Sequence, residues 1–143
     1  MMKYYLASVT VLCLLFSCNK REYSKADIES GMQRYDHLIQ RLDADSIALL
    51  YAPDGDLGTI AHGRDSIRRF LASFKNVRVL SNTSVSDSIE IKGDTAFQNG
   101  TYHQVAIIDA KDTADLKGTF HARWIWVNKE GWRIKKMETA PQK

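Results

Sequence analysis

The first half of the chain carries apolar side chains at helical spacing. After residue 24 they recur every three or four positions and would form one stripe, made of Ile28, Met32, Tyr35, Leu38, Ile39 and Leu42. Ser24 with Asp27 is typical of the start of such a helix, because both side chains can pair with free backbone N–H groups. A shorter second helix is expected next, with Asp45 as its cap and with Pro53 and Gly55 at its end.

Residues 50–74 join this helical half to a second half of different character. The segment reads as a helix end, a turn, a short extended piece and a new helix that begins at Gly63. The new helix also has one apolar stripe, made of Ile67, Phe70, Leu71 and Phe74. A helix with such a stripe must pack on another element.

β-Branched and aromatic residues dominate the rest of the chain, in runs separated by turn-forming residues. The runs cover residues 77–91, 95–109, 116–127 and 132–139. Consecutive runs joined in this way favour an antiparallel meander, and runs of this length usually bend. Three helices followed by a long curved sheet indicate an α+β domain with its helices on one face of the sheet.

The N-terminus has the parts of a secretory signal. Lys3 supplies a positive charge, and an apolar segment covers residues 6–16. Residues 15–18 resemble the lipobox of bacterial lipoproteins, in which cleavage leaves an acylated cysteine at the new N-terminus. By this resemblance Cys18 carries lipid. An ordinary cleaved signal with an incidental cysteine is the alternative.

This interpretation divides the chain into a signal peptide (1–17), a lipidated cysteine with its tether (18–24) and a globular domain (25–140). It implies a domain outside the cytoplasm, lipid-anchored to a membrane of the bacterial cell envelope, and to the outer membrane more readily than to the inner. The basic residues Lys20 and Arg21 in the tether would either touch anionic head groups or form a soluble spacer.

Charge and cysteine content exclude several classes of function. The net charge of +3 is far from the footprint of a nucleic-acid-binding protein. Both cysteines, Cys13 and Cys18, lie at the N-terminus, so the globular domain has neither a disulfide nor a thiolate metal site. We expect no cofactor and no bound metal.

Several short motifs resemble the nuclear transport factor 2-like superfamily, and within it the ketosteroid isomerases and the SnoaL-like proteins. They are residues 32–35, 50–54 and 62–67, and the closing hairpin with Trp124, Trp126 and 131–134. The resemblance spans about residues 27–139. It implies a cone-like fold, in which three N-terminal helices pack on a strongly curved, mainly antiparallel sheet and enclose a pocket between the first helix and the sheet.

Strand alternation, aligned with the isomerase hairpin, predicts which side chains enter that pocket. The expected ligand-binding set is Tyr35, Asn99, Thr101, His103, His121 and Arg123. The opposite sheet face, through which relatives commonly pair, would hold Tyr102, Gln104, Ala106, Ile108, Ala122, Trp124 and Trp126. An apolar patch of this size favours a homodimer.

Tyr35 coincides with the tyrosine that isomerases use as an oxyanion-hole donor. A core tyrosine with one satisfied hydroxyl is the simpler alternative. The other two isomerase residues are missing, because the general base falls at about Thr59 and the second donor at about Arg123. The isomerase mechanism is therefore not expected.

His103, His121 and Tyr35 are the candidates for catalysis, with a histidine as general base. In such a position a histidine is more often a structural residue with its hydrogen bonds satisfied. With His62 they have no spacing that indicates a metal site. Asp54 is expected to cap backbone amides in its turn, and the tryptophans are expected to pack in the core.

Three functions fit the sequence. The first is a membrane-anchored binding module for a small apolar molecule with an anionic or carbonyl end near Arg123. The second is a SnoaL-like enzyme of the isomerase, cyclase or dehydratase type, with a pocket histidine as base. The third is a structural or interaction lipoprotein with a filled core. We favour the binding module.

Overall fold

The computed structural model describes residues 22–143, and the expected signal peptide, Cys18 and most of the tether lie outside the described residues. The helices are α1 (Lys25–Arg41), α2 (Ala44–Leu50) and α3 (Arg64–Ala72). The strands are β1 (Tyr51–Leu57), β2 (Ala61–His62), β3 (Val77–Lys92), β4 (Thr95–Ile108), β5 (Asp112–Val127) and β6 (Gly131–Pro141). The predicted α+β class is confirmed. Within residues 22–143 no helix is long and apolar enough to span a membrane.

The helices begin close to where the sequence predicts. Ser24 and Asp27 form the expected capping box at the start of α1. The cap of α2 is Asp43 rather than Asp45, since Asp43 accepts a 3.1 Å hydrogen bond from the Ser46 backbone. The end of α2 also differs from the prediction, because Tyr51 already starts β1.

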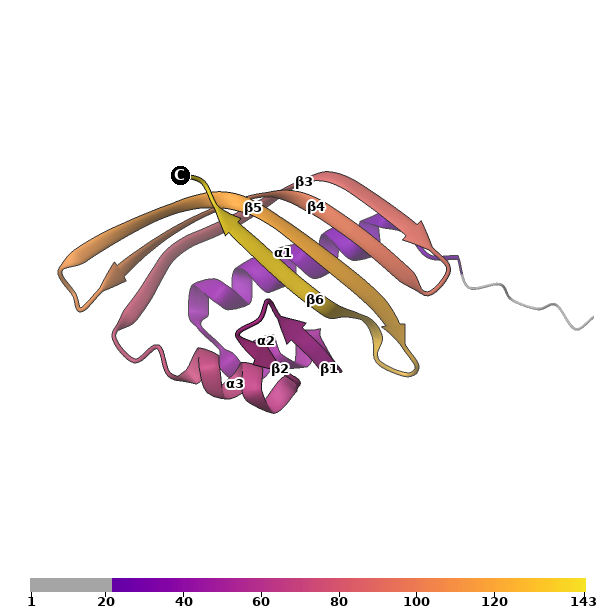
Figure 1. Cartoon of the computed structure of the whole chain (residues 1–143), viewed down its shortest axis with the longest axis horizontal. Coiled ribbons are helices and arrows are strands. Elements are labelled where there is room, and N and C mark those ends of the chain that lie inside the picture. Colours follow the sequence, from indigo (N-terminus) through magenta and orange to yellow (C-terminus); the bar gives the residue numbers. More distant parts are fainter. Residues whose placement is uncertain (1–21) are drawn as a thin grey trace, which may run out of the picture.

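The sheet has the order β2-β1-β6-β5-β4-β3, and Figure 1 shows its four long strands curving over the helices. β3 to β6 form the predicted antiparallel meander. The sequence did not predict β1, which pairs parallel to β6 with an irregular register between Tyr51 and Asp56. This irregular step contains Pro53, which lacks the N–H that a regular ladder needs.

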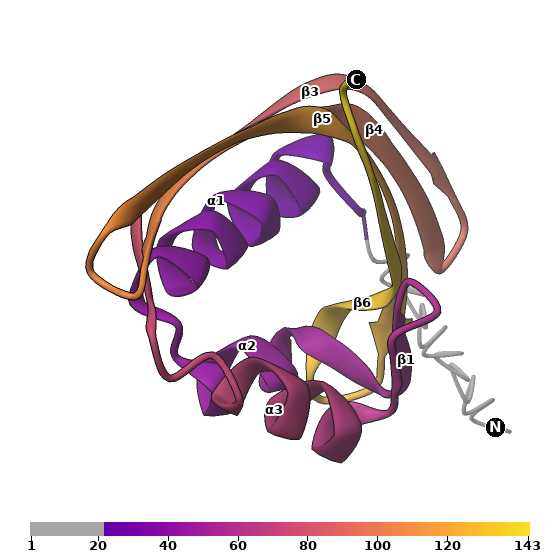
Figure 2. The ribbon, with the colours of Figure 1, turned by 60° about the vertical axis from the view of Figure 1, so that its left-hand side comes forward.

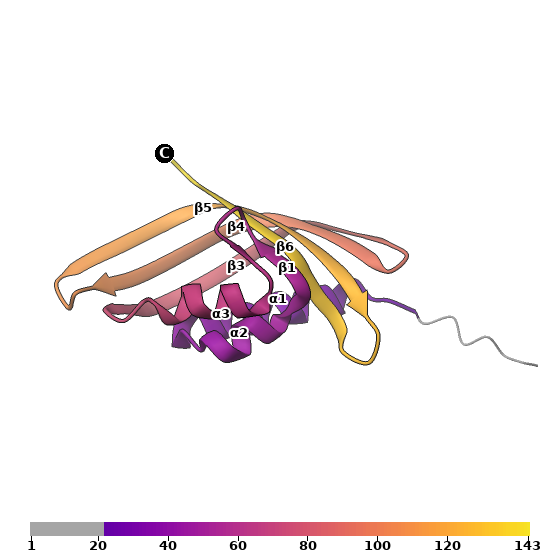
Figure 3. The ribbon, with the colours of Figure 1, turned by 60° about the horizontal axis from the view of Figure 1, so that its bottom comes forward.

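The curvature of the sheet creates a concave face. Figure 2 shows α1 within this curve and α2 with α3 below it, and Figure 3 shows the same helices on one side of the sheet. The strands approach closely where they bend. A Cβ at Gly100 would lie 2.1 Å from the Val85 carbonyl oxygen and 2.7 Å from the Phe120 ring, so only glycine fits there.

The core lies between α1 and the concave face. Trp124 is 1% exposed, and its indole Nε1 donates a 3.0 Å hydrogen bond to Gln98 Oε1. Gln98 Nε2 then donates to Ser86 Oγ, and Ser86 Oγ donates to Glu29 Oε2 on α1. The chain of bonds satisfies the buried indole and amide and ties β5, β4 and β3 to the helix.

Candidate functional site

A cavity of about 450 Å³ lies between α1, α3 and the concave sheet face. Its apolar lining consists of Met32, Ile39, Leu57, Ile60, Phe70, Leu71, Phe74, Leu116, Phe120 and Met137. Its polar lining consists of Tyr35, Asn82, Ser84, Tyr102, Gln104 and Thr139. The volume lies in the range of small-molecule sites, which are mostly apolar with a few polar groups.

The cavity lining is electrically neutral, since none of the described residues that form it is an acid, a base or a histidine. Three of its apolar side chains, Ile60, Phe74 and Leu116, are also substantially exposed to solvent. Ile60 lies in the turn between β1 and β2, Phe74 lies just after α3 and Leu116 lies on β5, and together they mark where the cavity opens. A neutral apolar molecule could therefore enter without stripping water from a buried charge.

Tyr35 lies on the apolar stripe of α1 and lines the cavity as predicted. Its ring meets the ring of fully buried Tyr51 edge to face, with centroids 6.4 Å apart. Burial raises the pKa of Tyr35, and the neighbouring Tyr51 side chain partly opposes that rise. The Tyr35 hydroxyl thus stays protonated at neutral pH and is available as a hydrogen-bond donor.

The polar wall of the cavity is anchored by Asp36, the next residue of α1. Its carboxylate accepts hydrogen bonds from Asn82 Nδ2 at 2.7 Å and from the Ser84 backbone and hydroxyl at 2.8 Å. Burial raises the pKa of Asp36, although these bonds from Ser84 and Asn82 oppose the rise. Asn82 Oδ1 in turn accepts a 3.0 Å hydrogen bond from Gln104 Nε2.

The sequence did not single out this wall. Asp36, Asn82 and Ser84 come from α1 and β3, and the tertiary fold brings them together. The one available signal was the polar character of Asn82 and Gln104 within otherwise β-forming runs.

The predicted orientation of the other pocket residues is wrong. The alternate residues Gln98, Phe120, Ala122 and Trp124 are buried, and Tyr102 and Gln104 line the cavity, so this set marks the inner face. Strand alternation then places Asn99, Thr101, His103, His121 and Arg123 on the outer face of the sheet. A shift of one residue in strand parity exchanges the two faces.

The outer-face residues form surface contacts rather than a site around Tyr35. His103 Nε2 lies 2.7 Å from Asp115 Oδ1, and His121 Nδ1 lies 2.7 Å from Asn99 Oδ1. Arg123 is exposed and lines a shallow depression of about 260 Å³ on the outer face. Neither histidine is placed to act as a base on a ligand beside Tyr35, and no guanidinium of residues 22–143 lines the cavity.

The same inversion overturns the residues predicted for a dimer patch. Ala106, Ala122 and Trp124 are buried in the core, and Tyr102 and Gln104 line the cavity. Trp126 joins an aromatic cluster with Tyr23 and Trp132. The buried and cavity-lining side chains of this set do not form an outer-face patch, whereas Ile108 is exposed, and the homodimer itself stays a prediction.

Asp54 and Asp56 are surface groups. The Asp54 carboxylate pairs with Lys135 at 2.6 Å, and this bond lowers the pKa of Asp54. Asp56 lies 2.6 Å from His62. In the part of the chain that the structure describes, no three histidine, cysteine or acidic side chains gather as a metal site would require.

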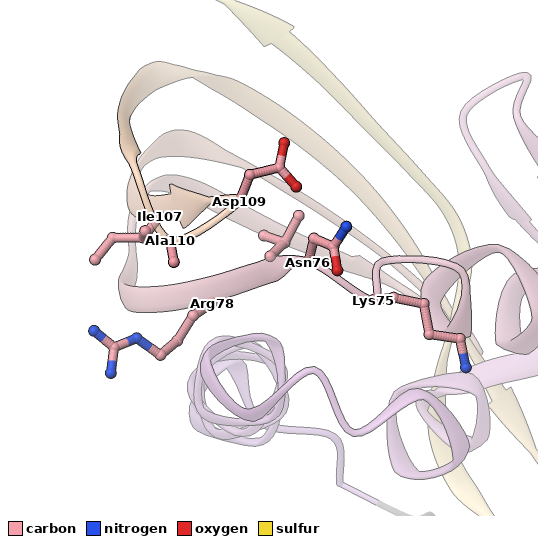
Figure 4. A pocket seen from close by; sticks show the side chains of 7 residues that line it. Lys75, Asn76, Arg78, Ile107, Asp109 and Ala110 are labelled. Atoms are coloured by element: carbon pink, nitrogen blue, oxygen red, sulfur yellow. The ribbon is translucent and has the colours of Figure 1, made fainter.

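A larger depression of about 770 Å³ lies beside the start of β3 and the β4–β5 turn. Figure 4 shows that its side chains diverge, with Arg78 and Lys75 at opposite ends and Asp109 directed away from both. Polar groups that do not converge cannot hold one ligand group between them. We therefore take the cavity beside Tyr35 as the candidate site.

Comparison with known proteins agrees with this architecture. The family model of the SnoaL-like domain matches residues 23–138. No curated protein sequence matches the chain.

Solved structures show the same fold at low identity. A nuclear transport factor 2-like superfamily protein from Salmonella enterica is 20% identical, with a TM-score of 0.71 over 82% of this chain and 90% of its own. A ketosteroid isomerase-like protein from Erwinia carotovora is 18% identical, with a TM-score of 0.72 over 82% of this chain and 95% of its own. A protein of unknown function from Mycobacterium tuberculosis is 20% identical, with a TM-score of 0.73 over 82% of this chain and 76% of its own. The chain therefore belongs to the SnoaL-like domain family, and it has the fold of the nuclear transport factor 2-like proteins.

Proposed function

We propose that this domain binds a neutral, largely apolar small molecule with a carbonyl group in the cavity beside Tyr35. The observation that carries the proposal is the cavity lining, which combines many apolar side chains with a few hydrogen-bonding groups and no charge among the described residues. The Tyr35 hydroxyl, which is protonated at neutral pH, would donate to the carbonyl. The anionic end that an inward Arg123 would have favoured has no counterpart in this lining.

The lining favours binding over proton transfer. A general base at neutral pH is usually a histidine or a carboxylate within hydrogen-bond reach of the substrate. Asp36 is the nearest carboxylate by sequence to Tyr35, and its oxygens are already engaged by Asn82 and Ser84. The groups that line the cavity can orient a ligand without reacting with it.

The N-terminal lipid on Cys18 remains part of the proposal. α1 begins at Lys25, only seven residues after Cys18, so a lipid there would hold the domain near the membrane. The start of α1 and the β4–β5 turn lie at opposite ends of the molecule (Figure 1). Leu116 at the cavity opening is close in sequence to that turn, so a ligand would enter from the end remote from the anchor.

A fluorescence titration with naphthyl methyl ketone tests the binding function. The probe has an apolar body and one carbonyl, and its emission changes when it leaves water. We expect saturable binding that Tyr35→Phe weakens about fivefold, the loss of one hydrogen bond of about 1 kcal/mol. Thr139→Trp, at an exposed position that lines the cavity, should abolish binding by filling it.

Matched changes on the outer face serve as controls. Thr119→Trp adds the same side chain at another exposed threonine, on β5, and Arg123→Met removes the guanidinium that the sequence placed in the pocket. Neither should change the affinity. Absence of saturable binding, or equal loss in the two tryptophan variants, would refute the proposed function.

A further inference from the structure

The hydrogen bonds of the polar wall have a defined direction. Asp36 Oδ2 faces the Ser84 backbone N–H, which can only donate, and Asp36 Oδ1 faces both the Ser84 hydroxyl and Asn82 Nδ2. An ionised carboxylate accepts hydrogen bonds and donates none. The Asn82 side chain must therefore present its NH₂ group to Asp36.

The orientation of the Asn82 amide also fixes the orientation of the Gln104 amide. With its NH₂ directed at Asp36, Asn82 presents Oδ1 to Gln104, which must offer its own NH₂ group at 3.0 Å. The register agrees, because Asn82 and Gln104 are paired across β3 and β4. One carboxylate on α1 thus sets the orientation of both amides, and Gln104 is two hydrogen bonds away from it.

The carbonyl oxygen of the Gln104 side chain, Oε1, is not used in this chain of hydrogen bonds. Gln104 lines the cavity, and no donor from residues 22–143 reaches its Oε1. We propose that Gln104 Oε1 is a specificity-determining acceptor that selects ligands with an O–H or N–H group. The inference rests on the proposed function and refines its ligand class to an apolar body with a carbonyl for Tyr35 and a separate hydrogen-bond donor for Gln104.

Gln104 Oε1 acts mainly by weakening the binding of ligands that have no hydrogen-bond donor. A ligand without a donor covers Oε1 and removes it from water without replacing its hydrogen bond. Sites built around a buried polar partner reject analogues that lack it much more strongly than apolar pockets reject a missing methylene.

Three related probes test this acceptor. They are naphthyl methyl ketone, its derivative with a hydroxyl on the ring remote from the ketone, and the methyl ether of that derivative. The unaltered domain should bind the hydroxy ketone about tenfold tighter than the ether and than the unsubstituted ketone. The unsubstituted ketone controls for the larger size of the ether.

Two variants separate the acceptor from its orientation. Gln104→Met keeps a side chain of similar length without polar atoms, so the three probes should bind with about equal affinity. In Asp36→Asn the new amide keeps its oxygen on the Ser84 N–H and offers NH₂ to Asn82, which reverses both following amides. Gln104 would then present a donor, and both oxygen-bearing probes should bind equally well and tighter than the unsubstituted ketone.

His103→Gln is the matched control, because it alters the outer face of the same strand and should leave the preference for the hydroxy ketone unchanged. Thermal unfolding without a probe checks that each variant is folded. If the ketones bind but the hydroxy ketone has no advantage, or keeps it in Gln104→Met, the inference is overturned while the proposed function stands. If none of the three probes binds, both are overturned.

Discussion

The two faces of strands β4 and β5 differ in the burial and in the hydrogen bonding of their side chains. The inner face carries Gln98, Phe120 and Trp124, which are at most 2% exposed and pack under α1. The outer face carries pairs such as His103 with Asp115, whose side chains remain 43% and 60% exposed. Polar groups on the inner face are tied into directed networks, whereas those on the outer face pair locally and in contact with water. Position in the pleat, rather than residue type, therefore decides which side chains can form a site.

The largest expected difference between the two faces is in the free energy of unfolding of two adjacent alanine variants on β5. Trp124→Ala should lower the free energy of unfolding by about 3–5 kcal/mol, because it opens a cavity and leaves Gln98 Oε1 without its indole donor. Arg123→Ala, one residue away on the outer face, should change it by less than about 0.5 kcal/mol. Urea unfolding measures both, and similar losses in the two variants would mean that the face assignment is wrong.

A smaller effect is expected from the two acidic residues that anchor polar contacts on opposite faces. Asp36→Ala should cost about 1–3 kcal/mol, since Asn82 and the Ser84 N–H lose their acceptor in a partly buried place. Asp115→Ala removes the partner of His103 on the exposed face and should cost less than about 1 kcal/mol. Equal unfolding midpoints for the two variants would contradict the importance of the inner network.

The smallest effect is a difference in the pH dependence of stability. The pKa of Asp36 is raised from 3.8, so the folded state holds that proton more tightly and stability falls as pH rises from about 3.8 through the folded pKa. The pKa of Asp54 is lowered by Lys135, so its contribution grows as pH rises through the folded pKa towards 3.8.

Unfolding midpoints measured across the acid range should show these opposite signs. Relative to Asp36→Asn, the unaltered domain should lose stability with rising pH, and relative to Asp54→Asn it should gain. Two slopes of the same sign would show that the environments of the two carboxylates have been assigned wrongly.

The helices and the fold class could be read from the sequence because each rests on local pattern. The stripe from Ile28 to Leu42 and the box of Ser24 with Asp27 need no tertiary information. β1 could not be predicted, because its conformation depends on a tertiary contact rather than on local pattern. Its residues around Pro53 and Gly55 favour a turn, and only pairing with β6 makes them a strand.

It was harder to predict which residues of each strand point to the inner face of the sheet, and β4 shows why. Its inner positions include Gln98 and Gln104, and its outer positions include Phe97 and Val105, so neither set is clearly apolar. β5 does contain the signal, since Phe120, Ala122 and Trp124 alternate with polar residues. Alignment with the isomerase hairpin assigned that apolar set to a dimer patch, whereas burial under α1 was the simpler physical reading.

The central claim is that the inner face of the sheet is the binding face, and nuclear Overhauser effects from a bound probe test it most directly. Phe120 lines the cavity on the inner face, and Phe97 lines a depression on the outer face of the neighbouring strand. With naphthyl methyl ketone bound, we predict contacts from the acetyl methyl group to the Phe120 and Tyr35 rings and none to Phe97. Contacts to Phe97 without contacts to Phe120 would contradict the account.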